Sequence, residues 1–129
     1  MREEHLAMVG RGYEAFVKGD FDTLRELNDD ETVWRTPGLG PFKAEYKGAD
    51  GVIEYLTQLF ELSEGTVKVE AEHMYADEDR VVVLDHITAS RHGKGIDFHD
   101  VLVYEFRDSK FRSITQYELD EKALEAFWS

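Results

Sequence analysis

Two acid–histidine pairs mirror each other in the segment 83–106, VLDHITASRHGKGIDFHDVLVYEF. Asp85 and His86 lie on one predicted strand, and His99 and Asp100 lie on the next. Carboxyl and imidazole groups together can transfer protons or bind a metal ion. The strands that carry these residues must decide which side chains share a face, and therefore which chemistry is available.

Side chains alternate across a β-strand, and this alternation separates the acids from the histidines. The odd positions of 81–89 are apolar except Asp85, and the even positions of 98–106, which include Tyr104, are apolar except Asp100. We therefore predict that both aspartates point into the core and that both histidines lie on the outer face of the sheet.

The distance between the two aspartates depends on the turn that joins their strands. A two-residue turn at His92-Gly93 sets Asp85 directly opposite Asp100, whereas a turn at Gly93-Lys94 makes them diagonal neighbours. The sequence leaves both registers open. In either register the carboxyl groups are close, which raises the pKa of at least one of them.

A carboxyl group on an apolar face is costly unless it is paired or protonated. One ionised and one protonated carboxyl group would supply a base and a proton donor. We predict Asp85 as the base and Asp100 as the acid or orienting group. The alternative is that each aspartate pairs with a basic residue such as Arg35 or Arg112, or lines a wet pocket as a binding group.

Five further residues are candidates for contact with a ligand: Tyr13, Trp34, Tyr55, Tyr104 and Gln116. The two helical tyrosines lie on or near apolar helix faces, where a hydroxyl can donate to a ligand oxygen or belong to the core. Tyr104 shares the face of Asp100. The inward faces of the strands that carry Trp34 and Gln116 stay open, because apolar residues occupy both parities there.

A metal site is the other chemistry that the mirrored pairs suggest. The histidines at 73, 86, 92 and 99 have neither helical HxxxH spacing nor a His-x-His pair on one strand. His86 and His99 can meet only across strands on the outer face, where histidines are more often interface or solvent residues. We expect no metal and no cofactor.

The predicted elements are helices first and strands afterwards. Helical apolar spacing covers 3–18, 21–27 and 49–62, with Gly19 as a helix stop and Asp20 as the next N-cap. A strand is expected at 30–36, a loop at 37–48, further strands at 66–76, 80–91, 96–107 and 111–119, and a final helical turn in 120–129. This order predicts one α+β domain over residues 1–129.

Composition excludes several classes of partner. The 129 residues carry a net charge of −13, which opposes binding to nucleic acids and anionic membranes. The absence of cysteine excludes disulfides and Cys-ligated zinc, and fits a reducing compartment. No apolar run approaches the roughly 20 residues of a spanning helix, and the acidic start is no secretory signal. We expect a cytoplasmic protein without a nucleic-acid or membrane partner.

Several segments resemble the nuclear-transport-factor-2-like (NTF2-like) superfamily, and most closely its SnoaL-like, ketosteroid-isomerase-related branch. They are YEAFVKGDFDTLREL, VWRTPG, YKGADGVIEYL, the strand around YADEDRVVVL, and VYEFRDSKFRSITQYELD. The resemblance implies a cystatin-like cone, in which a curved mixed or antiparallel sheet wraps around three N-terminal helices. It also implies an apolar pocket for a small molecule and a homodimer formed through the convex face.

The catalytic positions of well-known branches are not matched. Ketosteroid isomerases, which use an aspartate base and a protonated aspartate, place their base where this chain has VWRTP, and their partner acid falls nearest Leu102 rather than Asp100. The arginine of the limonene-type epoxide hydrolases falls on Asp85. Polyketide-cyclase relatives use an acid/base pair in the cone, a role that Asp85 and Asp100 can fill.

We therefore predict a homodimeric cone that binds a small apolar molecule. If it is an enzyme, we expect a cofactor-free isomerase or cyclase that works by proton transfer between carboxyl groups and the substrate. The alternatives are a non-catalytic module that binds a small ligand and a dimeric association module, since this fold supports many functions.

Overall fold

The computed structural model describes residues 2–129, which form four helices and six strands. The helices are α1 (Arg2–Lys18), α2 (Phe21–Leu27), α3 (Gly48–Leu62) and α4 (Glu121–Trp128). The strands are β1 (Val33–Arg35), β2 (Glu45–Lys47), β3 (Lys68–Ala76), β4 (Arg80–Arg91), β5 (Lys94–Arg107) and β6 (Lys110–Glu118). None of the helices in this part of the chain is long and apolar enough to cross a membrane.

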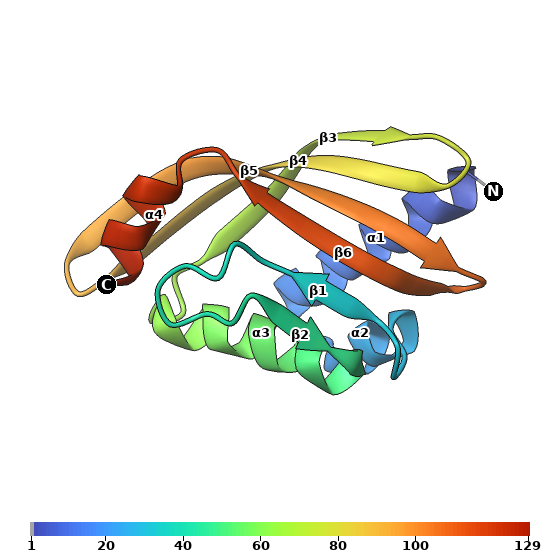
Figure 1. Ribbon diagram of the computed structural model, residues 1–129, viewed down its shortest axis with the longest axis horizontal. Coiled ribbons are helices and arrows are strands. Elements are labelled where there is room, and N and C mark those ends of the chain that lie inside the picture. The colour runs from blue at the N-terminus through green and yellow to red at the C-terminus, as the bar shows by residue number, and fades with distance from the viewer. Residues whose placement is uncertain (1) are drawn as a thin grey trace.

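The strands form one mixed sheet in the order β2-β1-β6-β5-β4-β3. Neighbouring strands are antiparallel except β1 and β6, which are parallel. Figure 1 shows the sheet curving over α1 and α3, with α4 at the end where β4 turns into β5. The predicted α+β cone around three N-terminal helices is confirmed.

Local signals position the first two helices as predicted. Gly19 ends α1 with a left-handed φ of 69°, and its N–H donates to the carbonyl of Phe16 at 3.2 Å. Asp20 then caps α2, because its side chain accepts the backbone N–H of Thr23 at 3.2 Å.

The bounds of several strands differ by a few residues from the prediction, β1 being shorter than the predicted strand 30–36, and two elements differ in kind or size. β2 lies inside the predicted loop 37–48 and pairs with β1. This strand has three residues, of which only Tyr46 is buried. So short a segment cannot show the alternation of apolar and polar residues that identifies a strand in a sequence. At the other end of the chain, α4 has eight residues rather than one turn, and it buries Leu124, Phe127 and Trp128.

The turn between β4 and β5 decides the open register. Arg91 pairs with Lys94, which leaves His92 and Gly93 as a two-residue turn. Both turn residues have positive φ, at 51° and 77°, as the tight hairpin turns that match strand twist require. Asp85 therefore lies directly opposite Asp100.

A bulge between β5 and β6 decides the inward face of the last strand. Phe106 pairs with Phe111, but Glu105 pairs with Ser113, so Arg112 is an extra residue. The extra residue lets Phe111 and Ile114 both be buried although they have opposite parity. Beyond the bulge, the even-numbered positions of β6 face the helices.

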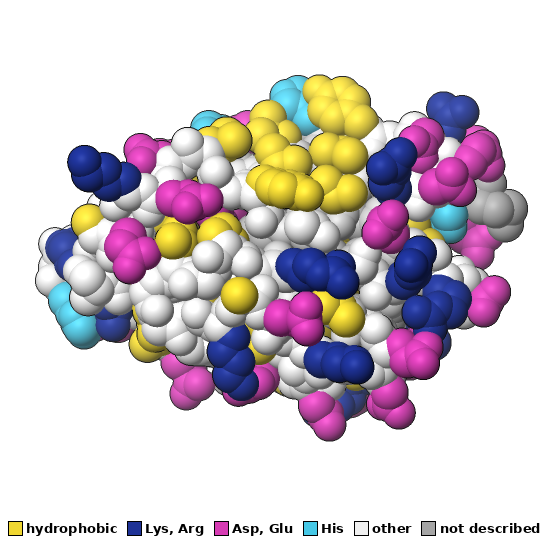
Figure 2. Space-filling model, viewed as in Figure 1, with side chains coloured by type: hydrophobic (Ala, Val, Ile, Leu, Met, Phe, Trp, Pro, Cys, Tyr) yellow, Lys and Arg dark blue, Asp and Glu magenta, His cyan; other side chains and the backbone are white. Residues whose placement is uncertain are grey.

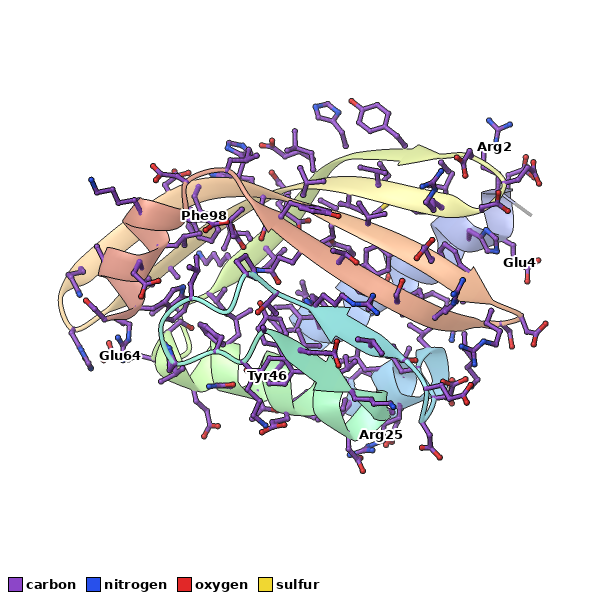
Figure 3. All side chains as sticks on the ribbon, in the orientation of Figure 1. Arg2, Glu4, Arg25, Tyr46, Glu64 and Phe98 are labelled. Carbon is purple, nitrogen blue, oxygen red and sulfur yellow. The ribbon has the colours of Figure 1, made fainter. Side chains whose placement is uncertain are left out.

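The core lies between the concave face of the sheet and the helices. The odd positions of β4 and the even positions of β5 are the buried ones, as predicted. At the far end of the cone, Phe98 packs against the buried residues of α4, and Figure 3 shows it beside that helix. Tyr46, between β2 and α3 in the same view, is 1% exposed.

Candidate active site

The interior of the cone contains a mostly apolar, partly open cavity of about 110 Å³. Residues from the helices, from β1 and β3–β6 and from the loop before β2 form its wall. Three carboxylic acids, Asp85, Asp100 and Glu118, lie on this wall. An apolar cavity with a few converging polar groups is the usual form of a small-molecule site.

The three carboxyl groups form a row across three adjacent strands. Asp85 on β4 is opposite Asp100 on β5, and Asp100 is opposite Glu118 on β6. Opposed residues of antiparallel strands point to the same side of a sheet, so all three acids face the cavity. Asp85 and Asp100 are only 2% and 3% exposed.

At one end of this carboxyl row, Asp85 is hydrogen-bonded to one of two paired tyrosines. The hydroxyl of Tyr13, on α1, donates to Asp85 Oδ1 at 2.6 Å. Tyr104, on β5, hydrogen-bonds to Tyr13 and approaches Asp85. Burial raises the pKa of both tyrosines far above the ordinary value, so their hydroxyls stay protonated and act as hydrogen-bond donors.

At the other end of the carboxyl row, Gln116 is hydrogen-bonded to Glu118. Its Nε2 donates to Glu118 Oε2. Its Oε1 accepts the Tyr55 hydroxyl at 2.7 Å and the Trp34 Nε1–H at 3.1 Å. With both ends of the amide engaged, Gln116 is oriented by α3 and β1, and Glu118 is oriented by Gln116.

The local environment separates the pKa values of the row. Burial raises the pKa of Asp85 to about 6, against the hydrogen bond from Tyr13, which lowers it. Burial, together with the charges of Glu118 and Asp85, raises the pKa of Asp100 to about 11. Burial also raises the pKa of Glu118. At neutral pH Asp85 is thus mostly ionised while Asp100 keeps its proton.

Two buried oxygens of the row have no N–H or hydroxyl donor in the described part of the chain. Asp100 shares protons with the carboxyl groups on either side, but its buried Oδ1 has no N–H or hydroxyl partner among residues 2–129. The same holds for the buried Oε1 of Glu118. Unsatisfied buried acceptors are rare, and they mark places where a bound molecule can supply the missing donor.

The structure brings every sequence-predicted site residue to the cavity wall: Tyr13, Trp34, Tyr55, Asp85, Asp100, Tyr104 and Gln116. The alternative pairing of the aspartates with Arg35 or Arg112 is wrong. Arg35 lies 3.8 Å from Glu45, and Arg112 is an exposed bulge residue.

Sequence reasoning missed Glu118 and the α4 residue Trp128, which also line the cavity. A signal for Glu118 was present, because it is two residues after Gln116 and must share its face. The bulge at Arg112 hid this signal, since Phe111 and Ile114 suggested opposite inward faces for the strand.

The histidines lie on the outer face, as predicted, and form a separate cluster. His86 and His99 are opposite each other, with ring centroids 4.8 Å apart. Glu72, which the β3 bulge leaves unpaired, lies 3.0 Å from His99 Nε2. Asp97 lies 2.6 Å from His86 Nε2 and raises the pKa of that histidine. The ligand atoms of Glu72, His86 and His99 are all within 4.8 Å of one another, the spacing of a group that can bind a metal ion.

Removing the Tyr13 hydroxyl is expected to raise the pKa of Asp85 further. The hydrogen bond from Tyr13 stabilises the ionised carboxylate, and Tyr13→Phe removes it. A ¹³C NMR titration of the aspartate side chains measures the shift. Tyr55→Phe is the matched control, because its hydroxyl bonds Gln116 rather than Asp85. An unchanged or lowered pKa in Tyr13→Phe would contradict this assignment.

Comparison with known proteins gives consistent matches over nearly the whole chain. The SnoaL-like domain family matches residues 9–114. The structure of Bal32a from a soil-derived mobile gene cassette superposes with a TM-score of 0.94 at 31% identity, covering 99% of this chain and 98% of Bal32a. Uncharacterized protein Rv0034 of Mycobacterium tuberculosis is 25% identical over 125 residues, which are 96% of this chain and 95% of the relative. A Xanthomonas campestris protein of unknown function with a cystatin-like fold has a TM-score of 0.86 at 22% identity, covering 96% and 97% of the two chains.

Proposed function

Because this chain belongs to the SnoaL-like branch of the NTF2-like superfamily, we propose that its cavity binds a small apolar molecule and catalyses a cofactor-free proton transfer on it. The reaction class is an isomerisation or a cyclisation. Asp85 acts as the base and Asp100 as the acid. The supporting observation is the pair of opposed, buried carboxyl groups whose pKa values are about 6 and about 11.

The proposed chemistry follows from the protonation states of the pair. Ionised Asp85 takes a proton from a carbon next to a carbonyl group, and protonated Asp100 donates a hydrogen bond to the oxygen that becomes negative. In an isomerisation, Asp85 then returns the proton to a different carbon of the same molecule. Two carboxyl groups whose environments separate their pKa values can divide the base and acid roles in this way.

The supporting residues hold the pair in place. Tyr13 orients Asp85 through its 2.6 Å hydrogen bond. Gln116 orients Glu118, which is the neighbour of Asp100 on the side away from Asp85. We assign Tyr13, Trp34, Tyr55, Tyr104 and Gln116 to ligand contact, as members of the cavity wall.

Carboxyl titration by ¹³C NMR is expected to separate the two aspartates. Asp85 should titrate near pH 6, and Asp100 should stay protonated well above neutral pH, because burial disfavours its ionised form. Ordinary values, near about 4, for both Asp85 and Asp100 would rule out the acid/base pair.

Activity is tested with a small unsaturated ketone. Cyclohex-3-enone becomes cyclohex-2-enone when a base moves one proton, and the conjugated product is followed by its ultraviolet absorption. We expect faster conversion with the protein than with buffer alone. A ketone that binds in the cavity without being converted would support the alternative, a non-catalytic ligand-binding module.

We further propose that the convex face of the sheet forms a homodimer. Outward residues of adjacent strands make two apolar rows, Tyr75-Val82-Val103 and Leu84-Val101-Tyr117. Tyr75 and Tyr117 are 61% and 56% exposed. Figure 2 shows hydrophobic side chains gathered on the side of the molecule that the sheet forms. A contiguous exposed apolar patch of this kind is typical of a protein interface.

Val103→Lys is expected to convert the dimer to a monomer, because it places an unpaired charge in the middle of the apolar rows. Sedimentation velocity measures the change. The control is Val17→Lys, which adds the same charge to an exposed position on α1. A wild-type protein that sediments as a monomer would contradict the proposal.

The cytoplasmic location and the single domain over 1–129 stay predictions.

A further inference from the structure

We propose that the cavity selects an apolar molecule that carries a basic amine and excludes carboxylates and other anions. This inference rests on the proposed function, because it concerns the ligand of the same cavity. It goes beyond that function by naming the charge and the hydrogen-bonding groups of the ligand. Three features of the wall support it independently.

The first feature is the charge of the wall. Among the residues that line the cavity there is no lysine, arginine or histidine, whereas Asp85, Asp100 and Glu118 are all acids. None of these neighbours of Asp85 carries a positive charge. Tyr13 and Tyr104 are neutral, and Ala71 lies opposite Asp85 on β3. An anion that entered would lose its hydration without gaining a cation in return, which opposes its binding.

The second feature is the pair of unpartnered acceptors. Asp100 Oδ1 and Glu118 Oε1 are buried and have no N–H or hydroxyl donor among residues 2–129, and both residues line the cavity. An ammonium group has three N–H donors and no acceptor, which suits a wall that has acceptors to fill. A hydroxyl brings one donor, and a carboxylate brings none.

The third feature is the aromatic lining. Trp34 and Tyr55 have ring centroids 5.1 Å apart, and Phe42 and Trp128 have ring centroids 4.9 Å apart. All four residues line the cavity. The faces of aromatic rings attract a cation, most strongly in tryptophan and where water is excluded. Aromatic walls around a carboxyl row therefore favour a protonated amine over a neutral molecule of the same shape.

The test uses three probes with one ring and different polar groups: benzylamine, benzyl alcohol and benzoate. Trp34 and Trp128 are the two tryptophans of the chain and both line the cavity, so tryptophan fluorescence reports binding directly. At neutral pH we expect benzylamine to bind about tenfold more tightly than benzyl alcohol, the order of one favourable cation–aromatic or charge contact. Benzoate is expected to bind more weakly than benzyl alcohol.

The preference for the amine over the alcohol is expected to change with pH in one direction. The wall gains the negative charge of Asp85 when this carboxyl group ionises, and burial raises its pKa to about 6. The ratio of amine to alcohol affinity should therefore rise between about pH 5 and about pH 8, by roughly tenfold. Asp85→Asn should remove this rise and lower the ratio itself. Glu118→Gln, which keeps the acidic pair, is the second variant and should lower the ratio without removing the rise.

The possible outcomes separate the two proposals. If benzyl alcohol binds and benzylamine binds no better, or if benzoate binds as tightly as the alcohol, the amine inference is wrong and the binding cavity stands. If none of the three probes binds to folded protein, the proposed binding function fails, and the inference fails with it.

Discussion

Asp85→Asn is expected to slow cyclohex-3-enone isomerisation by about 10²- to 10⁴-fold, the usual effect of removing a general base. Asn has the shape of Asp, and its side-chain oxygen can still accept the 2.6 Å hydrogen bond from Tyr13. The cavity and the fold are thereby kept while the basic group is lost. The loss should be in kcat more than in KM, because Asp85 is proposed to act on the reacting proton.

The pH profile gives a readout that misfolding cannot imitate. In the wild type, kcat/KM should rise with pH up to about 6, where Asp85 becomes ionised, and then level off. Asp97→Asn is the matched control, since it removes an exposed carboxylate on the outer face that contacts His86. A wild-type rate in Asp85→Asn, or an equal loss in Asp97→Asn, would contradict the role of Asp85.

Asp100→Asn is expected to make the protein more stable above neutral pH, by about 2–4 kcal/mol at about pH 8. In the unfolded chain this carboxyl group ionises at its ordinary pKa of 3.8, but burial and two neighbouring acids raise the folded pKa to about 11. Folding at pH 8 must therefore bind a proton, and that costs free energy. Asn is neutral in both states and avoids the cost.

The direction in which stability changes with pH follows from the raised pKa of Asp100. Because the folded state binds more protons than the unfolded state above about pH 4, wild-type stability should fall as pH rises. Asp85 contributes with the same sign between about pH 4 and about pH 6. Below this range both states are protonated, so wild type and Asp100→Asn should be nearly equal.

Urea unfolding of both proteins at several pH values measures the difference. Comparing variant with wild type cancels the repulsion of the surface acids, which also grows with pH in a chain of charge −13. Asp97→Asn again serves as the control and should change little. An Asp100→Asn protein that is less stable than wild type at about pH 8 would contradict the raised pKa of Asp100. Greater stability with lost activity is typical of a group retained for function.

Part of the candidate site is predictable because strand alternation is local. Asp85 and Asp100 are single acids in otherwise apolar series of alternate residues, and their common face follows without any knowledge of pairing. Gly19 and Asp20 likewise end one helix and begin the next through backbone conformation and side-chain capping.

Other parts were not predictable, because they depend on irregular or distant pairing. The bulge at Arg112 changes the parity of β6, and it hid the inward faces of Gln116 and Glu118. β2 has too few residues to show an alternation of apolar and polar positions, and it is a strand through its pairing with β1. Trp34 faces inward, opposite Ile114 on β6, although Val33 is equally apolar.

By itself, the sequence determined the α+β class, the split between inward aspartates and outward histidines, and the lack of any thiol chemistry. These follow from the order, alternation and identity of neighbouring residues. Only the tertiary structure decided that the carboxyl groups form a row of three, which of them keeps its proton, and which side chains hold them. Those properties arise from contacts between residues far apart in the chain, such as Tyr13 and Asp85, and from burial that exists only after the helices cover the sheet.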